Sequence, residues 1–389
     1  MKIKILVDKK EKKIFVDDPS TIAILENGFY GKREGKLLIL SPTEALYLID
    51  IRNGVCFDTS SNNEISFNEL VNLFYEKKQL AKYFGYCGWR ERGLILRDLK
   101  FENLKVYKKS PSIKYEGKKT IFKPLNCSLY FYKDDLLSIL EDKEKAQKLY
   151  SEHWFGQLGV YKSEHKGLIT KFDIFETIFL TKHCKLKIKN CSLEEVLATA
   201  KKKYKDFEKI YKVYEDWRLN GFILKTGFKF GTHFRIYFPK NQNNNFEHSK
   251  HVLEVFSRKN KQVIYKWARA IRLAHSVKKT FVLAIDGQKK EISTKEKPFL
   301  ADFVLYSRKK DGISKPLKDD PSYLMLCLSE YNLLSGEYLA QAIEECKSFG
   351  LGLILAIADR ESSVTFYLVN RIDIPQSNYE YYQLEWFLP

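Results

Sequence analysis

The sequence contains no apolar stretch long enough to cross a lipid bilayer. One of the longest apolar runs covers only residues 351–358, whereas a membrane-spanning helix needs about 20 such residues. The first residues, MKIKILVDKKEKK, carry a charge every few positions and include no apolar signal segment. We therefore expect a protein that is neither secreted nor inserted into a membrane, and we predict a cytoplasmic location.

Paired cysteines are also missing. The seven cysteines are an odd number, they are scattered along the chain, and none of them forms a C-x-x-C pair. This pattern supports neither a disulfide framework nor a zinc ribbon, and we expect no cofactor. Linkers rich in Pro or in Gly and Ser are absent as well. The nearest approach to low complexity is the NQNNN run at residues 241–245, which we expect to be a solvated loop.

Basic residues, in contrast, are abundant. The 67 Lys and Arg exceed the 49 Asp and Glu, which gives a net charge of +18 spread along 389 residues. Such a surface favours a polyanionic partner, and nucleic acid is the obvious one; the alternative is a generally Lys-rich surface. The hydrophobic fraction of 44% excludes a largely disordered chain, and the length predicts several hydrophobic cores.

Internal similarity indicates repeated small lobes. Residues 28–50 and 153–182 both run from an aromatic residue and glycine through a short apolar strand into a helix, which carries Glu44 in one copy and Glu176 in the other. A second kind of lobe is indicated by residues 217–227, which resemble residues 89–99 at an offset of 128.

The C-terminal part carries a further partial copy of this second lobe. Residues 234–237 match 303–306, and two Ala-Ile pairs recur later at an offset of 72. We predict an α/β (α+β) protein built of repeated small lobes, with a larger mixed-sheet lobe and a degenerate C-terminal copy of it. The predicted divisions are a shortened N-terminal unit at 1–109, a complete unit made of an N-terminal lobe at 110–200 and the mixed-sheet lobe at 201–298, and the degenerate copy at 299–389.

The pattern within the lobe at 201–298 predicts its elements. Aromatic residues at helical spacing predict a helix over 204–217, and alternation predicts strands near 222–224 and 233–238. Helices are expected at 249–256 and 262–274, followed by a buried strand at 280–285.

Single titratable residues in this lobe are weak signals. His248 lies where a loop meets an expected helix start, a place more typical of a capping or surface histidine. His248 and His251 stand three residues apart, but no third ligand has convincing spacing for a metal site. Lys279 at the start of a strand would ordinarily be a solvated lysine, and any one of 24 tyrosines is ordinarily structural.

Taken together, these motifs resemble a known family. The strings at 214–237 (YEDWRLNGFILKTGFKFGTHFRIY), 247–249 (EHS) and 272–279 (RLAHSVKK) resemble the archaeal tRNA-intron splicing endonucleases, and GFYGK…LSPTEALYL resembles that family's N-terminal lobe. The arrangement of units resembles the three-unit, single-chain epsilon form. The resemblance implies that 201–298 is an endonuclease-like catalytic lobe and 1–109 a non-catalytic unit. It also implies that the family's catalytic residues fall on Tyr237, His248 and Lys279, and that Arg272 grips a flipped-out base of the RNA. The second arginine of that base clamp has no assigned counterpart.

The implied chemistry is metal-independent cleavage of precursor tRNA at a bulge-helix-bulge structure. The 2′-OH attacks its own phosphodiester, with Tyr237 as base, His248 as acid and Lys279 stabilising the developing charge. The products are a 2′,3′-cyclic phosphate and a 5′-OH. Because tyrosine has an ordinary pKa of about 10, only about 0.1% is ionised at pH 7; the charges of Lys279 and Arg235 are expected to lower that pKa. Arg235 and Lys278 are further expected RNA contacts.

The C-terminal copy retains apolar positions and loses polar ones. Tyr237 corresponds to Tyr306, but Lys279 corresponds to Leu351, Arg272 to Glu344, and His248 falls near Pro321. One active site per chain follows. The acidic loop with Asp359 and Glu361 resembles the family loop that docks on an opposing unit, which implies a homodimer with two active sites.

Two other classes of function remain open at this point. The first is a non-catalytic RNA-binding protein descended from such an enzyme. The second is a metal-dependent DNA endonuclease, which would need acidic residues clustered near a lysine; the residues around Tyr237 are basic instead.

Overall fold

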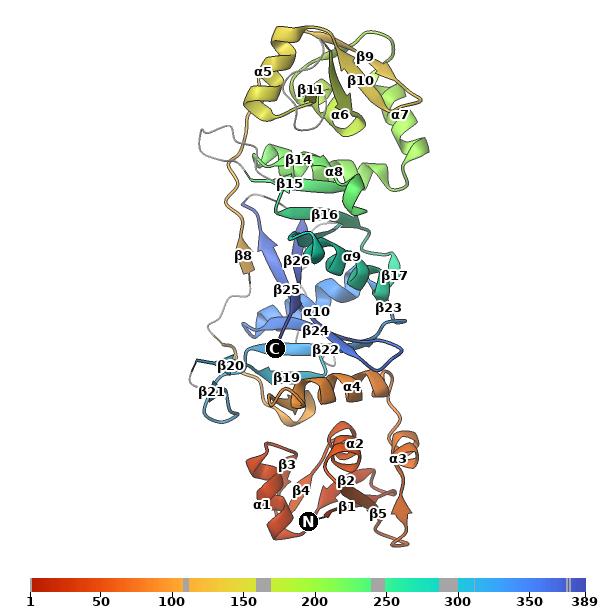
Figure 1. Ribbon diagram of the computed structural model, residues 1–389, viewed down its shortest axis with the longest axis vertical. Helices are drawn as coiled ribbons and strands as arrows, with labels where there is room; N and C mark the ends of the chain where they lie inside the picture. The colour runs from red at the N-terminus through yellow and green to blue at the C-terminus, as the bar shows by residue number, and fades with distance from the viewer. Residues whose placement is uncertain are drawn as a thin grey trace.

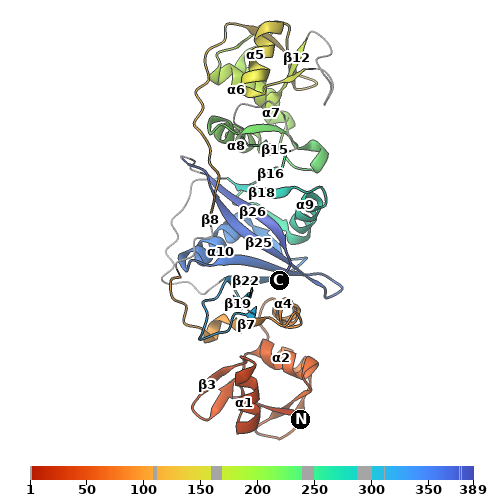
Figure 2. The same cartoon turned by 60° about the vertical axis from the view of Figure 1, so that its left-hand side comes forward.

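The computed structural model describes residues 2–107, 112–158, 169–238, 249–286, 300–310, 312–375, 377 and 379–389. The molecule is elongated, with a small α/β lobe at each end of a long central sheet (Figures 1 and 2). This arrangement confirms the predicted α/β class. In the described part of the chain, no helix combines the length and apolar character that a bilayer crossing requires.

The first small lobe lies at the N-terminal end. Its elements are β1 (Ile3–Asp8), β2 (Lys13–Val16), α1 (Pro19–Asn27), β3 (Lys32–Glu34), β4 (Leu37–Ile39), α2 (Pro42–Ile51), β5 (Gly54–Asp58), β6 (Glu64–Ile65) and α3 (Phe67–Leu73). The strand order is β3-β4-β2-β1-β5-β6. Helix α2 begins where the sequence supplies Ser41, Pro42 and Glu44, which form a capping box with proline at the first helical position.

The second small lobe lies at the opposite end. Its elements are β9 (Ser128–Tyr132), β10 (Leu137–Leu140), α5 (Lys143–His153), β11 (Gln157–Leu158), β12 (Thr170–Asp173), α6 (Ile174–His183), β13 (Lys187–Ile188) and α7 (Leu193–Lys203). The strand order β11-β12-β10-β9-β13 follows the same path as β3-β4-β2-β1-β5 in the first lobe. A capping box of Asp173 and Glu176 starts α6, as Ser41 and Glu44 start α2.

The central body contains the remaining elements. They are α4 (Gln79–Arg90), β7 (Ile95–Asp98), the 3₁₀ turn η1 (Leu99–Phe101), β8 (Ser112–Lys114), α8 (Phe207–Leu219), β14 (Ile223–Thr226), the 3₁₀ turn η2 (Phe228–Phe230), β15 (Phe234–Tyr237), β16 (His251–Phe256), β17 (Lys261–Val263), α9 (Ile264–Ser276), β18 (Thr280–Ile285), β19 (Phe303–Tyr306), β20 (Arg308–Lys309), β21 (Gly312–Ile313), β22 (Tyr323–Ser329), β23 (Leu333–Ser335), α10 (Gly336–Ser348), β24 (Gly352–Ala358), β25 (Val364–Asp373) and β26 (Glu380–Phe387). The long sheet runs β14-β15-β16-β18-β26-β25-β24-β22-β19-β7, and β8 also pairs with β25.

The two halves of this sheet share one pairing register. Tyr237 lies opposite Ile223, and Tyr306 lies opposite Ile95. Strands β16 and β18 pair in parallel, as do β22 and β24, and the paired residues of the second half stand 72 positions after those of the first. Helices α9 and α10 are separated by the same 72 positions. Strand β7 and helix α4, although N-terminal in sequence, thus occupy in one half the places that β14 and α8 occupy in the other.

The halves meet through strands that pair across an approximate two-fold axis. Gln262 of β17 pairs with Leu334 of β23, which stands 72 positions later. Val369 of β25 pairs with Leu384 of β26, while β25 also borders β24 and β26 borders β18. Strand β26, near the C-terminus, therefore borders the half of the sheet that contains β14, β15, β16 and β18.

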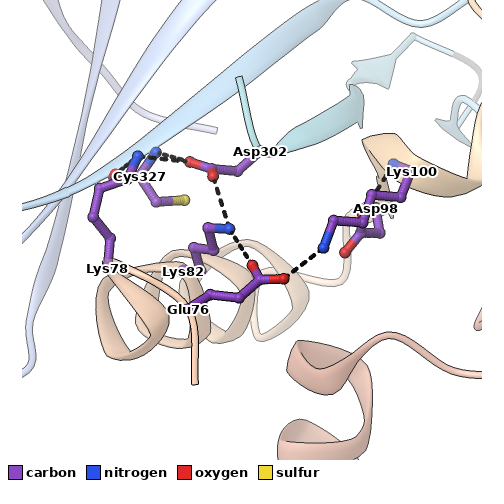
Figure 3. Close-up of polar contacts among 7 residues, drawn as sticks. All are labelled: Glu76, Lys78, Lys82, Asp98, Lys100, Asp302 and Cys327. Carbon is purple, nitrogen blue, oxygen red and sulfur yellow. Dashed lines mark hydrogen bonds and ion pairs between the residues drawn. The ribbon is translucent and has the colours of Figure 1, made fainter. Parts of the chain in front are cut away.

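An ion-pair network fastens the N-terminal segment to the C-terminal half (Figure 3). Lys82 bridges Glu76 at 2.8 Å and Asp302 at 3.4 Å. Lys100 reaches the second Glu76 oxygen at 2.6 Å, and an Asp302 oxygen accepts the backbone N–H of Cys327. Because the Asp302 side chain is only 7% exposed, these partners offset the cost of burying its charge. The contacts position α4 against the face of the central sheet, over β22 and β24.

The element predictions for the catalytic lobe are mostly confirmed. Helices α8 and α9, and strands β14, β15 and β18, lie within a few residues of their expected places. The helix expected at 249–256 is wrong, because residues 251–256 form β16. Their backbone groups pair with β15 on one side and β18 on the other, and these ladders override a local pattern that also fits a helix.

Candidate active site

Strand β15 presents Tyr237 and Arg235 on one face. Alternation buries Phe234 and Ile236 and turns Arg235 and Tyr237 to the other, partly exposed side. The Arg235 guanidinium carbon lies 5.8 Å from the centre of the Tyr237 ring, and its Nε donates to the carbonyl of Thr226 at 2.8 Å. This hydrogen bond between neighbouring strands holds the Arg235 cation next to Tyr237.

Lys279 is held where α9 turns into β18. Lys278, two residues after the end of α9, lies in the left-handed region at φ 54°, and the Lys279 N–H donates to the carbonyl of Ala274. The Lys279 ammonium donates to the Ser249 carbonyl and, at 2.9 Å, to its hydroxyl. Burial lowers the pKa of Lys279, and the charge of Arg235 lowers it further. The contacts with Ser249 therefore hold the Lys279 ammonium beside the start of β18.

His248, the expected acid, lies outside the described residues. It immediately precedes Ser249, the residue that Lys279 contacts. The nearby His251 has a different character. Its ring packs 4.9 Å from that of Phe238 and 5.6 Å from that of Tyr115, and burial lowers its pKa to about 4. His251 is therefore neutral at pH 7 and holds no proton to donate from an imidazolium there.

Two of the expected RNA contacts, Arg272 and Lys278, lie near the C-terminal end of α9 and are accessible to solvent. Arg272 and Lys278 are both exposed, one in α9 and the other just after it. Burial raises the pKa of the Tyr367 hydroxyl in β25, and the charge of Arg272 partly offsets this shift. Arg235 lies in β15, whereas Arg272, Lys278 and Lys279 lie in α9 or between α9 and β18.

The acidic loop connects β24 to β25 in the C-terminal half of the central sheet. Asp359 follows β24 and accepts the N–H groups of Glu361 and Ser363 through one carboxylate oxygen, each at 2.9 Å. Asp359 is partly exposed and Glu361 is exposed. The loop is therefore a formed turn that presents acidic side chains at the surface.

The corresponding positions of the C-terminal half are apolar or structural. Tyr306 is only 4% exposed, and burial raises its pKa. Leu351 is fully buried, and Glu344 forms an ion pair with Arg371. Within the described residues, this half offers no counterpart of Lys279.

Sequence reasoning missed three residues that surround the site. Trp154 of the second small lobe lies against Tyr237, with ring centres 4.6 Å apart. Ser249 binds Lys279, and Phe230 of η2 lies 5.0 Å from its ammonium. Trp154 belongs to the aromatic-glycine motif recognised as a repeat, but nothing in that motif indicates that it reaches a strand more than 80 positions later.

The described residues contain no group of three or more His, Cys, Asp or Glu side chains that could hold a metal ion. They do contain Tyr237 with the Arg235 guanidinium beside its ring, and the Lys279 ammonium held by Ser249. Phenol, guanidinium and ammonium groups suit proton transfer and the stabilisation of a phosphorane's negative charge. On a strongly basic α/β protein, such groups favour a protein that acts on a nucleic acid.

Comparison with known proteins gives the family. Residues 207–294 match the model of the tRNA intron endonuclease catalytic C-terminal domain, and residues 9–71 match that of the N-terminal domain. A tRNA-splicing endonuclease of Hyperthermus butylicus is 30% identical over 160 residues, which cover 39% of this chain and 87% of the relative. Those of Pyrobaculum islandicum (32%, covering 38% and 86%) and Methanopyrus kandleri (35%, covering 32% and 70%) are similar. The chain belongs to the tRNA intron endonuclease family and is an RNA endonuclease.

Proposed function

We propose that this protein is a tRNA-splicing endonuclease that excises introns from precursor tRNA at bulge-helix-bulge structures. The observation that carries the proposal is that Tyr237, with Arg235 beside its ring, and Lys279 lie in the segment that matches the family's catalytic domain. The relatives named tRNA-splicing endonucleases support precursor tRNA as the substrate. The net charge of +18 favours a phosphate backbone as partner.

The reaction uses the nucleophile that RNA itself carries. Tyr237, as the phenolate, takes the proton of the 2′-OH, the oxygen attacks the adjacent phosphorus, and His248, as the imidazolium, protonates the departing 5′-oxygen. Lys279 stabilises the charge of the phosphorane, and Arg235 holds positive potential beside the phenol. The P–O5′ bond breaks as the P–O2′ bond forms, which leaves a 2′,3′-cyclic phosphate and a 5′-OH without a metal ion. Arg272 and Lys278 bind the RNA.

The chain has one such site and is a homodimer in this proposal. Its divisions are a shortened unit at 1–109, a complete unit at 110–298 and a degenerate copy at 299–389. The shared register of the two half-sheets supports that copy, with α4 and β7 of the first division completing it. The acidic turn of Asp359 and Glu361 docks on an opposing chain, and the protein works in the cytoplasm.

The first test is cleavage of end-labelled, intron-containing precursor tRNA in EDTA. The wild type is expected to cut twice and to leave cyclic phosphates, while His248→Ala loses cleavage and Tyr237→Phe keeps only a small residual rate. Tyr306→Phe is the matched control, because it removes the corresponding hydroxyl from the C-terminal half and is expected to leave the rate unchanged. Loss of wild-type activity in EDTA, or full activity of Tyr237→Phe, would contradict the mechanism.

The alternative is a non-catalytic protein that binds structured RNA. Its mark would be tight binding of the same precursor without cleavage by the wild type. The presence of Tyr237, His248 and Lys279 together in one unit, against Tyr306, Pro321 and Leu351 in the copy, favours the enzyme.

A further inference from the structure

The second small lobe reaches the β14–β15 hairpin through the turn that follows α5. Trp154 ends this helix in the left-handed region at φ 51°, and its N–H donates to the carbonyl of Tyr150 at 2.8 Å. Phe155 is fully buried, and Gly156 has φ 76°. A side chain at Gly156 would collide with Thr170 and Phe172 at 2.5 and 2.8 Å. The turn therefore has little freedom to change shape.

A partly buried ion pair joins this turn to the hairpin. Lys225 of β14 lies opposite Arg235 of β15, so its side chain is on the same face as Arg235 and Tyr237. The Lys225 ammonium donates to the Gly156 carbonyl at 3.0 Å and to a Glu176 oxygen at 2.7 Å. The same Glu176 oxygen accepts the Gly156 N–H at 3.1 Å. The Lys225 and Glu176 side chains are only 13% and 5% exposed, so solvent competes little with these contacts.

As a consequence, the Trp154 ring is held in a fixed position beside the phenol ring of Tyr237. The Trp154 and Tyr237 rings meet edge to face, with an interplanar angle of 61° and 4.6 Å between centres, a geometry that aromatic pairs favour. The guanidinium of Arg235 also lies within reach of the Tyr237 ring, at 5.8 Å. Since a base works only when its oxygen points at the proton it removes, the direction of this ring matters.

We propose that Trp154 is a positioning residue for Tyr237, held in place by the ion pair of Lys225 and Glu176. This inference rests on the proposed function, because it assigns a task to a residue that acts through the base. It also gives the second small lobe a part in the reaction: this lobe sets the orientation of a group that the catalytic half supplies.

The N-terminal unit offers a matched comparison. Phe29 there has the left-handed conformation of Trp154, at φ 58°, and Gly31 donates its N–H to Glu44 at 2.9 Å. Arg97 donates to the Gly31 carbonyl at 2.7 Å, as Lys225 donates to that of Gly156. The turn itself is thus a shared structural device. A purely structural role for Trp154 predicts that Trp154 and Phe29 are equally important for cleavage, whereas positioning of Tyr237 predicts that they differ.

The experiment is single-turnover cleavage of precursor tRNA at saturating enzyme, with RNA affinity measured separately. We expect Trp154→Ala to slow cleavage by about 10- to 100-fold with affinity changed by less than about two-fold. Trp154→Phe keeps an aromatic edge and should restore most of the rate, and Phe29→Ala should cleave like the wild type. Trp154→Leu deletes the ring edge while keeping apolar volume, and it serves if the alanine variant does not fold.

A double-mutant cycle with Tyr237→Phe separates positioning from general damage. If Trp154 acts through the tyrosine hydroxyl, adding Trp154→Ala to Tyr237→Phe lowers the rate no further. A full additional loss, an equal loss in Phe29→Ala, or a wild-type rate in Trp154→Leu would overturn the inference. Wild-type cleavage that depends on Tyr237 but not on Trp154 would overturn it alone, whereas absence of cleavage by the wild type would overturn the proposed function as well.

Discussion

The pH dependence of stability is expected to depend strongly on His251. Its ring packs against Phe238 and Tyr115, and its Nδ1 is buried with no hydrogen-bond partner among the described residues. Burial lowers its pKa from an ordinary value of 6.5 to about 4, and the charges of Lys250 and Lys279 add to this shift. Between pH 4 and pH 6.5, His251 is therefore mostly protonated in the unfolded chain and mostly neutral in the folded chain.

The sign and size of the effect follow from this difference. Stability is full above pH 6.5, where both states hold a neutral imidazole, and it is lost as the pH falls toward 4 because only the unfolded state gains the proton. At pH 5, about 97% of unfolded chains but only about 9% of folded chains carry it. The resulting loss of unfolding free energy between pH 8 and pH 5 is about 2 kcal/mol, which corresponds to about 2 °C in Tm for a chain of this length.

The assay compares thermal unfolding at pH 8 and pH 5 for the wild type and for His251→Phe. Phenylalanine places an apolar ring between two aromatic neighbours and does not titrate. Because other groups titrate equally in both proteins, the difference between the two pH-induced shifts isolates His251. We expect the wild type to lose about 2 kcal/mol more than the variant. Equal losses in the two proteins would refute the reasoning, since they would mean that His251 titrates alike in the folded and unfolded states.

Three further predictions concern the assembly of the sheet and its surfaces. Tyr381→Phe removes a 2.6 Å hydrogen bond from β26 to the Asp216 carboxylate of α8, and it should lower the free energy of unfolding in urea by about 1.5–3 kcal/mol; an unchanged midpoint would show that this bond contributes nothing. Asp359→Lys combined with Glu361→Lys should halve the mass measured by light scattering, and an unchanged mass would exclude this turn as the dimer contact. Arg272→Ala should weaken binding of precursor tRNA by about 1–3 kcal/mol in a filter-binding titration, and wild-type affinity would remove it from the RNA surface.

Much of the local structure could be read from the sequence because local chemistry sets it. Ser41 with Glu44, and Asp173 with Glu176, form capping boxes that start α2 and α6 from residues three positions apart. Alternation in β15 decides which side chains of the strand are buried and turns Arg235 and Tyr237 to one face. The motifs that predicted Tyr237 and Lys279 lie at β15 and just before β18, and Arg235 of β15 lies beside the Tyr237 ring.

Residues 251–256 mark where local reasoning fails. The segment HVLEVF fits a buried helix as well as a buried strand, since nearly every position is apolar or partly buried. Its conformation is decided by β15 and β18, which supply backbone partners on both sides. The sequence of the segment itself does not indicate that β15 and β18 will pair with it.

The sequence by itself determined the kinds of lobe, their helix starts, the faces of their strands and the residues of the candidate site. The tertiary structure alone decided that β26 closes the sheet beside β18, that α4 and β7 join the half built from residues 303–387, and that Trp154 lies against Tyr237. Each of these contacts joins segments far apart in the chain. They form because exposed sheet edges and apolar faces must be covered, and the segment that covers them is chosen by three-dimensional fit, which no short stretch of sequence encodes.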